Sequence, residues 1–267
     1  MFVSPNWSVA SQVNAIYTNR LGGVSEFPYD SFNLATHVDD DMTAVMHNRN
    51  SLMTAVPLPS QPFWLDQQHT QKVVYVGTQM QSQSSIYSSA SENAPAPVLP
   101  VADASWTDQP GQVLAVMTAD CLPVLLATKQ GDKVAAIHAG WRGLAKGIIS
   151  QTIKAMGVTA ADLQVWIGPS ISQRFFEVGK EVKKEFEAKN PNYAQAFELK
   201  NEQTKCKYMA DLPAIAQMEL EGLGVNNIKQ SHLCTYADKA QFFSYRRDGQ
   251  TGRIASLIWI NPVPKSE

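Results

Sequence analysis

Residues 113–143 hold the side chains whose types could do chemistry together. Cys121 lies in an Ala-Asp-Cys turn, and His138 opens the run His-Ala-Gly-Trp-Arg-Gly. Three apolar runs flank these residues, at 113–118, 122–128 and 134–137. Apolar runs bounded by turn residues predict strands, and the Lys-Gln-Gly-Asp segment between the last two predicts a hairpin turn. The sequence therefore places a thiol and an imidazole at the ends of neighbouring predicted strands.

The register of this hairpin decides whether the two side chains meet. If 122–128 pairs antiparallel with 133–139, Pro123 faces His138, and Cys121 lies on the same face, diagonal to His138. Diagonal neighbours have α-carbons roughly 7–8 Å apart, within reach of a shared ion. A slip of one residue would put the side chains on opposite faces. The sequence permits a Cys–His site here without requiring one.

A third ligand candidate is His69, which precedes a predicted strand at 72–76. One thiolate and two imidazoles suit zinc, with a fourth position left open for water. Zinc would lower the pKa of that water to about 7. Two alternatives stay open. Cys121 and His138 could form a nucleophilic pair oriented by Asp120 or another carboxylate, or Cys121 could be a buried core thiol beside ordinary histidines.

Several other residues could bind an anion or a base. The run Gly140–Gly143 carries Arg142 and predicts a strand-to-helix turn that could bind phosphate, although a plain tight turn explains it equally well. Arg246, Arg247 and Arg253 surround a predicted hairpin turn at 248–252, where arginines are commonly solvated. His232 and Cys234 alternate on a predicted strand at 228–236 and fit either a second metal site or a core thiol.

The composition excludes some classes of partner. The 267-residue chain is 44% hydrophobic and has a net charge of −2, so it predicts a substantial core and no attraction to nucleic acid or anionic membranes. The N-terminus lacks the pattern of a signal peptide, and no apolar run is long enough to cross a membrane. The three cysteines lack close pairs, which predicts free thiols and a cytoplasmic location. Oligomeric state stays open.

The remaining pattern predicts an α/β or α+β fold of mixed sheets covered by helices. Polar, turn-rich residues 21–41 predict a long loop, which contains Asn33 and His37. Helices are expected at 41–55, which contains Arg49, at 143–157, at 178–190 and from about 211. Further strands are expected at 163–169 and at the C-terminus, and 190–207 is expected to be irregular. No linker divides the chain, so we expect one domain over 1–267 with a mobile insertion at 79–98.

Motifs distributed along the chain resemble those of one family. They are GGVSEFPYDSFNLATHV at 22–38 with NR at 48–49, QQHTQKVV at 67–74, TADCLPVLL at 118–126, HAGWRGLAKGI at 138–148, IGPSIS at 167–172 and FFSYRRDGQTGR at 242–253. Together they are similar to the YfiH family, also called the laccase-domain or multicopper polyphenol oxidoreductase family. The resemblance extends nearly from end to end, except over 79–98.

The resemblance implies a zinc site at His69, Cys121 and His138. It also implies a layered α/β fold similar to cysteine hydrolases of the cytotoxic-necrotizing-factor type. Members are described as purine nucleoside phosphorylases that act on adenosine, inosine, guanosine and methylthioadenosine, and as adenosine deaminases. Other descriptions are peptidoglycan editing and laccase activity. With a nucleoside and phosphate as the small-molecule substrates, we expect Asn33, Arg49, Arg142 and Arg247 to bind them and the three metal ligands to act in catalysis.

Counting histidines limits the laccase description. A blue-copper centre takes two His, one Cys and a weak axial ligand, which this chain could supply, so copper at the His69, Cys121 and His138 site is possible. The additional copper cluster of a multicopper laccase needs many more histidines than the five present. A zinc enzyme acting on purine nucleosides is therefore the leading hypothesis. A Cys/His hydrolase of cell-wall precursors and a non-catalytic binding protein are the alternatives.

Overall fold

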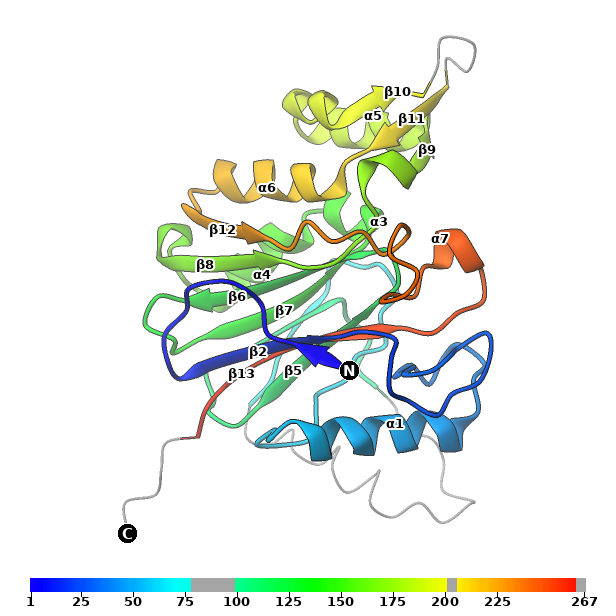
Figure 1. Cartoon of the computed structure of the whole chain (residues 1–267). Helices are drawn as coiled ribbons and strands as arrows, with labels where there is room; N and C mark the ends of the chain where they lie inside the picture. The colour runs from blue at the N-terminus through cyan, green and yellow to red at the C-terminus, as the bar shows by residue number, and fades with distance from the viewer. Residues whose placement is uncertain (78–98, 201–205, 263–267) are drawn as a thin grey trace.

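The computed structural model describes residues 1–77, 99–200 and 206–262. It has a mixed α/β architecture in which two sheets stack face to face and helices cover their outer faces (Figure 1). This confirms the predicted fold class. The predicted insertion at 79–98 lies outside the described residues, and the single-domain assignment stays a prediction.

The larger sheet carries the central hairpin. Its strands are, in spatial order, β12 (Asn227–Gln230), β8 (Leu163–Ile167), β6 (Leu122–Thr128), β7 (Val134–Ala139), β4 (Ala104–Thr107) and β3 (Val73–Tyr75). The outermost pair at each edge is parallel and the inner pairs are antiparallel. Pro123 pairs with His138, so the register predicted from the turn is confirmed.

A smaller sheet lies against this one. Its strands are β1 (Phe2–Val3), β2 (Val13–Thr18), β13 (Ile254–Ile260) and β5 (Val113–Thr118), in that order. Every residue of β5, β6, β7 and β13 is buried. Strands buried on both faces read as continuous apolar runs rather than alternating ones, which is why these strands were recognisable in the sequence.

Three hydrophobic clusters hold the layers together. One lies between the sheets and includes Leu114, Leu125 and Trp166. A second joins the larger sheet to α4 (Ile148–Met156) and α6 (Leu212–Gly222). The third covers the smaller sheet with α1 (Met42–Ala55) and the loop that precedes it. Asp41 caps α1 and Asp211 caps α6, each accepting a hydrogen bond from a backbone N–H of the first turn.

One helix prediction and one hairpin prediction need correction. The helix expected over 143–157 is two helices, α3 (Trp141–Ala145) and α4, separated at Gly147, which has a φ of 85°. The hairpin expected at 248–252 is a short helix, α7 (Tyr245–Asp248), followed by an extended segment into β13. In both places a short helix ends beside a glycine with a positive φ, which is 85° at Gly147 and 69° at Gly249.

Two further segments differ from expectation. The strand expected over 228–236 ends at Gln230, and His232 has a φ of 54°, so His232 and Cys234 do not alternate along one strand. The segment 190–207, expected to be irregular, contains a 3-10 helix at Pro191–Ala196 and the strand β10 (Phe197–Leu199), and β11 (Lys207–Ala210) begins at its end. These two strands and β9 (Glu177–Gly179) form a third sheet beside α5 (Lys180–Lys189).

Residues 21–40 form a loop, as expected, but some of their side chains belong to the core. Phe32 and Leu34 are fully buried in the cluster under α1. Their polar neighbours hid this contribution in the sequence.

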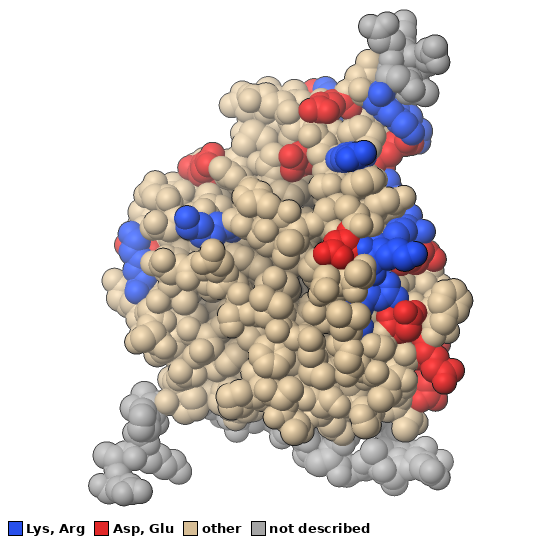
Figure 2. Space-filling view, in the orientation of Figure 1, with Lys and Arg blue, Asp and Glu red and all other residues tan. Residues whose placement is uncertain are grey.

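Lys and Arg gather beside α7 on the face shown in Figure 2, together with acidic side chains, whereas most of that face is uncharged. Within the described ranges, no helix has the length and apolarity needed to cross a membrane.

Candidate metal centre and its cavity

Three residues far apart in the sequence meet at one end of the central hairpin. Cys121 immediately precedes β6, His138 lies in β7, and His69 lies in the segment before β3. Their ligand atoms all lie within 4.8 Å of one another, and the Cys121 Sγ is 3.5 Å from the His69 Nε2. The two imidazole rings meet edge to face with centroids 4.8 Å apart. The structure thus brings together the three residues selected from the sequence.

These distances fit a metal ion. In tetrahedral coordination, zinc bonds of about 2.0–2.1 Å to nitrogen and 2.3 Å to sulfur hold the two ligand atoms about 3.5 Å apart. That separation matches the observed Cys121–His69 distance of 3.5 Å. The donor set of one sulfur and two nitrogens suits both zinc and copper. His69, Cys121 and His138, whose ligand atoms all lie within 4.8 Å of one another, could therefore hold a metal ion.

One buried carboxylate orients both histidines. The Oδ1 of Asp103 accepts a hydrogen bond from the His138 Nδ1 at 2.7 Å and another from the backbone N–H of His69 at 3.0 Å. Its Oδ2 accepts from the Thr70 backbone N–H and hydroxyl. The bond at Nδ1 leaves the Nε2 of His138 as its ligand atom. Asp103 also binds the backbone N–H of His69, which has a φ of 58°, a backbone conformation that residues other than glycine rarely adopt.

The thiol and its neighbouring imidazole form an ion pair when no metal separates them. Burial disfavours the thiolate, but the charge of His138 and hydrogen bonds from both imidazoles outweigh it and lower the pKa of Cys121 to about 6. Burial likewise disfavours the imidazolium, but the Cys121 thiolate and Asp103 raise the pKa of His138 to about 9. Cys121 is consequently available as a thiolate, the form that binds metals.

Gly140 is required here by space rather than by backbone conformation. Its φ of −63° is ordinary, but a Cβ at this position would lie 2.4 Å from the His69 Cδ2 and 3.2 Å from the Cys121 Sγ. Gly143 packs in the same way against the Thr70 carbonyl oxygen, which would be 2.9 Å from an added Cβ. The glycines of the Gly-Trp-Arg-Gly run thus allow the chain to pass close to the ligands.

The three ligands lie in the wall of a cavity of about 480 Å³. Its lining combines aromatic side chains (Trp141, Phe176, Tyr245), aliphatic ones (Met117, Ile171, Leu212), and the cations Arg142, Arg246 and Arg253. A cavity of this volume with mostly apolar walls and a few convergent polar groups is typical of a small-molecule site.

Asp120 also lines the cavity, but it does not orient a histidine. Its Oδ1 accepts from the Thr235 hydroxyl at 2.6 Å, and its Oδ2 accepts from the Ser244 hydroxyl and the Arg246 backbone N–H at 3.0 and 2.7 Å. The role proposed for Asp120 from the sequence therefore belongs to Asp103. Asp120, which has a φ of 86°, instead fixes the segment that enters α7.

The predicted substrate-binding residues have different positions. Arg142 lines the cavity and stacks on Trp141. Arg49 does not line it; its Nε donates to the Leu34 carbonyl and its guanidinium lies over Trp64. Asn33 is fully buried, and its Oδ1 accepts from the backbone N–H groups of Ala35 and Arg253. In this conformation Asn33 and Arg49 shape the loop rather than the cavity wall, and their substrate-binding roles stay predictions.

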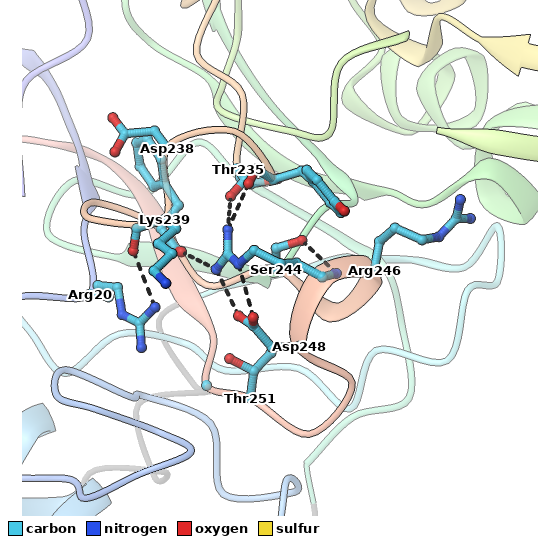
Figure 3. Close-up of polar contacts among 12 residues, drawn as sticks. Arg20, Thr235, Asp238, Lys239, Ser244, Arg246, Asp248 and Thr251 are labelled. Carbon is cyan, nitrogen blue, oxygen red and sulfur yellow. Dashed lines mark hydrogen bonds and ion pairs between the residues drawn. The ribbon is translucent and has the colours of Figure 1, made fainter. Parts of the chain in front are cut away.

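Arg247 belongs to a separate network that includes Thr235 and Asp248, both of which are labelled in Figure 3. It donates to the carbonyls of Thr235, Tyr236 and Phe242 and pairs with Asp248 at 2.7 Å. Figure 3 shows the Arg246 side chain extending away from this network. Arg246 lines the cavity and Arg247 does not.

Several residues in or beside the cavity were not selected from the sequence. Arg246 and Arg253 were noticed as a cluster, but sequence spacing could not tell which arginine faces the cavity. Asp103 precedes β4 and gives no local signal, because its partners lie more than thirty residues away in sequence. His37 lines the cavity too, and burial followed by the charge of Arg253 lowers its pKa, so its imidazole is neutral.

The second metal site considered at His232 and Cys234 receives no support. Among the described residues, His69, Cys121 and His138 are the group found with metal-ligand geometry. The Cys234 Sγ accepts hydrogen bonds from the backbone N–H and hydroxyl of Ser172. This thiol therefore joins two loops.

Comparisons with known proteins identify relatives along the whole chain. Residues 14–261 match the family described as multi-copper polyphenol oxidoreductase laccase. The chain is 42% identical over 259 residues to "Purine nucleoside phosphorylase PA4543" of Pseudomonas aeruginosa, covering 97% of this chain and 98% of that protein. It is 41% identical over 258 residues to "Purine nucleoside phosphorylase YfiH" of Escherichia coli, again covering 97% and 98%.

Solved structures agree with these sequence relatives. The crystal structure of Neisseria meningitidis protein NMB0706 superimposes with a TM-score of 0.86 at 41% identity, covering 98% of this chain and 99% of that one. Bacillus licheniformis YfiH gives a TM-score of 0.83 at 30% identity, covering 94% and 93%. The chain therefore belongs to the YfiH, or multi-copper polyphenol oxidoreductase laccase, family, as its motifs predict.

Proposed function

We propose that this protein is a metal-dependent purine nucleoside phosphorylase whose active site is the cavity at His69, Cys121 and His138. The observation that carries the proposal is the meeting of a metal-ligand group, aromatic walls and several arginines around one cavity. The relatives named purine nucleoside phosphorylase support the same substrate class. Inosine, adenosine, guanosine and methylthioadenosine are the candidate nucleosides.

The reaction to be catalysed is a substitution at the anomeric carbon of the ribose. A phosphate oxygen forms a bond to C1′ while the C1′–N9 bond breaks, its electron pair leaves with the base, and the base takes up a proton. The products are the free purine and ribose 1-phosphate. Trp141, Phe176 and Tyr245 offer flat surfaces for the base. The neutral imidazole of His37 is placed to exchange a proton or hydrogen bond with it.

His69, Cys121 and His138 would hold the metal ion. Zinc is the ion we propose, because phosphorolysis calls for a Lewis acid and involves no change of oxidation state. When bound, zinc would supply a Lewis acid that polarises a substrate oxygen or activates water. Asp103 holds the His138 Nδ1, which would leave the His138 Nε2 to bind the ion. Activated water in the same cavity would also account for adenosine deamination, which we include as a second activity to test.

A cysteine hydrolase is the second candidate, and one specific observation favours it. Cys121, His138 and Asp103 form a linked thiol, imidazole and carboxylate, in which the pKa of Cys121 is lowered to about 6. Such an arrangement also activates a nucleophile. The two functions need Cys121 in different states, since a metal-bound thiolate cannot attack a substrate while it remains a ligand.

The test uses protein prepared metal-free and then loaded with one equivalent of zinc or of copper. Each form is given inosine and phosphate, adenosine alone, a polyphenol, or a muropeptide precursor, and products are identified by mass spectrometry. We expect zinc-loaded protein to release hypoxanthine and ribose 1-phosphate, and expect Cys121→Ala and His138→Ala to release neither.

The outcomes separate the candidates. Nucleoside cleavage that requires both phosphate and metal supports the proposal. Muropeptide cleavage by metal-free protein, lost in Cys121→Ala, would replace it with the cysteine hydrolase. Polyphenol oxidation by the copper form without any nucleoside turnover would favour the laccase description instead.

A further inference from the structure

Three arginines of the cavity share one arrangement. Each guanidinium lies over an aromatic ring that lines the same cavity, with distances of 4.5 Å for Arg142 over Trp141, 5.1 Å for Arg246 over Phe176 and 5.9 Å for Arg253 over Tyr245. Stacking holds a guanidinium plane in place while its N–H edge stays available. The cavity therefore presents three oriented cations rather than three freely moving ones.

These cations are not neutralised by carboxylates. Within residues 1–77, 99–200 and 206–262, none of the three arginines forms a salt bridge. Asp120 is the acidic residue in the lining, and three hydrogen bonds already engage its oxygens. The cavity consequently has an excess of positive charge, in a protein whose net charge is −2.

Two of the guanidinium groups keep one edge available. In the described part of the chain, Arg246 donates from Nη1 to the Glu177 carbonyl, and Arg253 donates from Nη1 to the carbonyls of Thr251 and Gly252. Their Nε and Nη2 atoms donate no hydrogen bond to another residue of that part of the chain. The Nε–Nη2 edge is a planar pair of donors that matches two oxygens of a phosphate.

Arg246 and Arg253 are also connected to the surroundings of the metal ligands. The backbone N–H of Arg246 donates to Asp120, the residue before Cys121, at 2.7 Å. The backbone N–H of Arg253 donates to Asn33 in the buried loop at 2.9 Å. Burial lowers the pKa of Arg253, while the charges of Cys121 and Asp120 act in the opposite direction, which places this guanidinium within their electrostatic reach. The cationic edge and the ligand group thus belong to one site.

We propose that Arg246 and Arg253, with Arg142 beside them, bind inorganic phosphate as the second substrate of the phosphorolysis. This inference rests on the proposed function, since hydrolysis or deamination would need no phosphate site. The same chemistry would also accept the phosphate group of a nucleotide. A purine nucleoside phosphorylase requires the free anion to bind beside an unphosphorylated nucleoside, so inorganic phosphate is the occupant that this site should prefer.

The experiment measures phosphate binding and phosphate kinetics separately. Zinc-loaded wild type, Arg246→Gln and Arg253→Gln are titrated calorimetrically with inorganic phosphate and with inosine 5′-monophosphate, then assayed with inosine at varied phosphate. Charge-assisted hydrogen bonds of this kind predict that each variant raises the Kd and the KM for phosphate roughly 10- to 100-fold. The KM for inosine should change much less.

Arg174→Gln is the matched control. Arg174 also stacks on an aromatic ring, Phe175, at 5.5 Å, but it lines a different cavity. It should leave phosphate binding and turnover unchanged. Because Arg246 is exposed, its variant should fold even if Arg253→Gln does not, which circular dichroism would check.

Each result decides one point. If wild type cleaves inosine with phosphate and both variants keep the wild-type KM for phosphate, this phosphate site is wrong while the function stands. If wild type binds phosphate through these arginines but never cleaves nucleosides, the anion site stands and the function is wrong. Tighter binding of inosine 5′-monophosphate than of phosphate would assign the arginines to a nucleotide.

Discussion

At the scale of single residues, the candidate metal site depends on a carboxylate that is not itself one of the candidate ligands. Asp103 is fully buried, and its two oxygens accept four hydrogen bonds from His138, His69 and Thr70. It therefore fixes the rotation of one imidazole and the backbone of the other. Removing a partner of this kind typically lowers metal affinity about 10- to 100-fold.

Asp103→Asn should weaken metal binding without removing a ligand. The amide keeps the side-chain shape, but its NH₂ group would face the N–H of Thr70 or the Nδ1 of His138, so one hydrogen bond becomes repulsive. We expect zinc affinity to fall about 10- to 100-fold in competition with a chelator. Asp108→Asn is the control, because Asp108 bonds to Tyr75 and Gln109 outside the cavity. Unchanged affinity in Asp103→Asn would contradict the orienting role.

Metal-free protein should show an unusually acidic thiol at Cys121. The charge of His138 overcomes burial and lowers its pKa to about 6, so the thiolate should persist down to that pH, whereas an ordinary cysteine has a pKa of about 8.5. Alkylation by iodoacetamide, followed by peptide mass spectrometry, should rise through a midpoint near this value. In His138→Gln the midpoint should move upward, and an identical midpoint in the two proteins would show that His138 is not the cause.

At the scale of elements, the sequence predicted best where local pattern and final contact coincide. The apolar runs identified β5, β6 and β7, and the turn between the last two determined which residue faces His138. Prediction failed where contacts are long-range. Asp120 engages Thr235, Ser244 and Arg246, all more than a hundred residues away, and no local spacing encodes that. The same contacts decide that Arg246, rather than Arg247, faces the cavity.

The turn from β7 into α3 makes a separate prediction. An added Cβ at Gly140 would come within 2.4 Å of the His69 Cδ2, so Gly140→Ala must displace His69 or Cys121. We expect zinc affinity and nucleoside turnover to fall at least tenfold while circular dichroism stays close to that of wild type. Gly222→Ala is the matched control, since a Cβ there meets nothing within 4 Å. Wild-type zinc affinity in Gly140→Ala would show that the ligands can move aside freely.

At the scale of the whole molecule, the metal ligands connect the edge of the larger sheet to its central hairpin. His69 precedes the edge strand β3, whereas Cys121 and His138 belong to the central hairpin. The hairpin is fixed by the cluster between the sheets, in which Leu125 faces Trp166 and Leu114 belongs to the opposite sheet. Metal binding should therefore stabilise the folded protein in addition to the core, because the unfolded chain offers no preformed site.

The stabilisation by zinc and the stabilisation by the core can be measured separately. Leu125→Ala creates a cavity between the sheets and should cost about 2–5 kcal/mol, seen as a lower Tm in both metal-loaded and metal-free protein. Zinc at 100 times its Kd should add roughly 2.7 kcal/mol to wild type and to Leu125→Ala alike. It should add almost nothing to His138→Ala, which lacks a ligand. Leu223→Ala, at a side chain that is 40% exposed, controls for the loss of a leucine. An equal zinc-dependent rise in the Tm of His138→Ala would mean that the ion binds elsewhere on the protein.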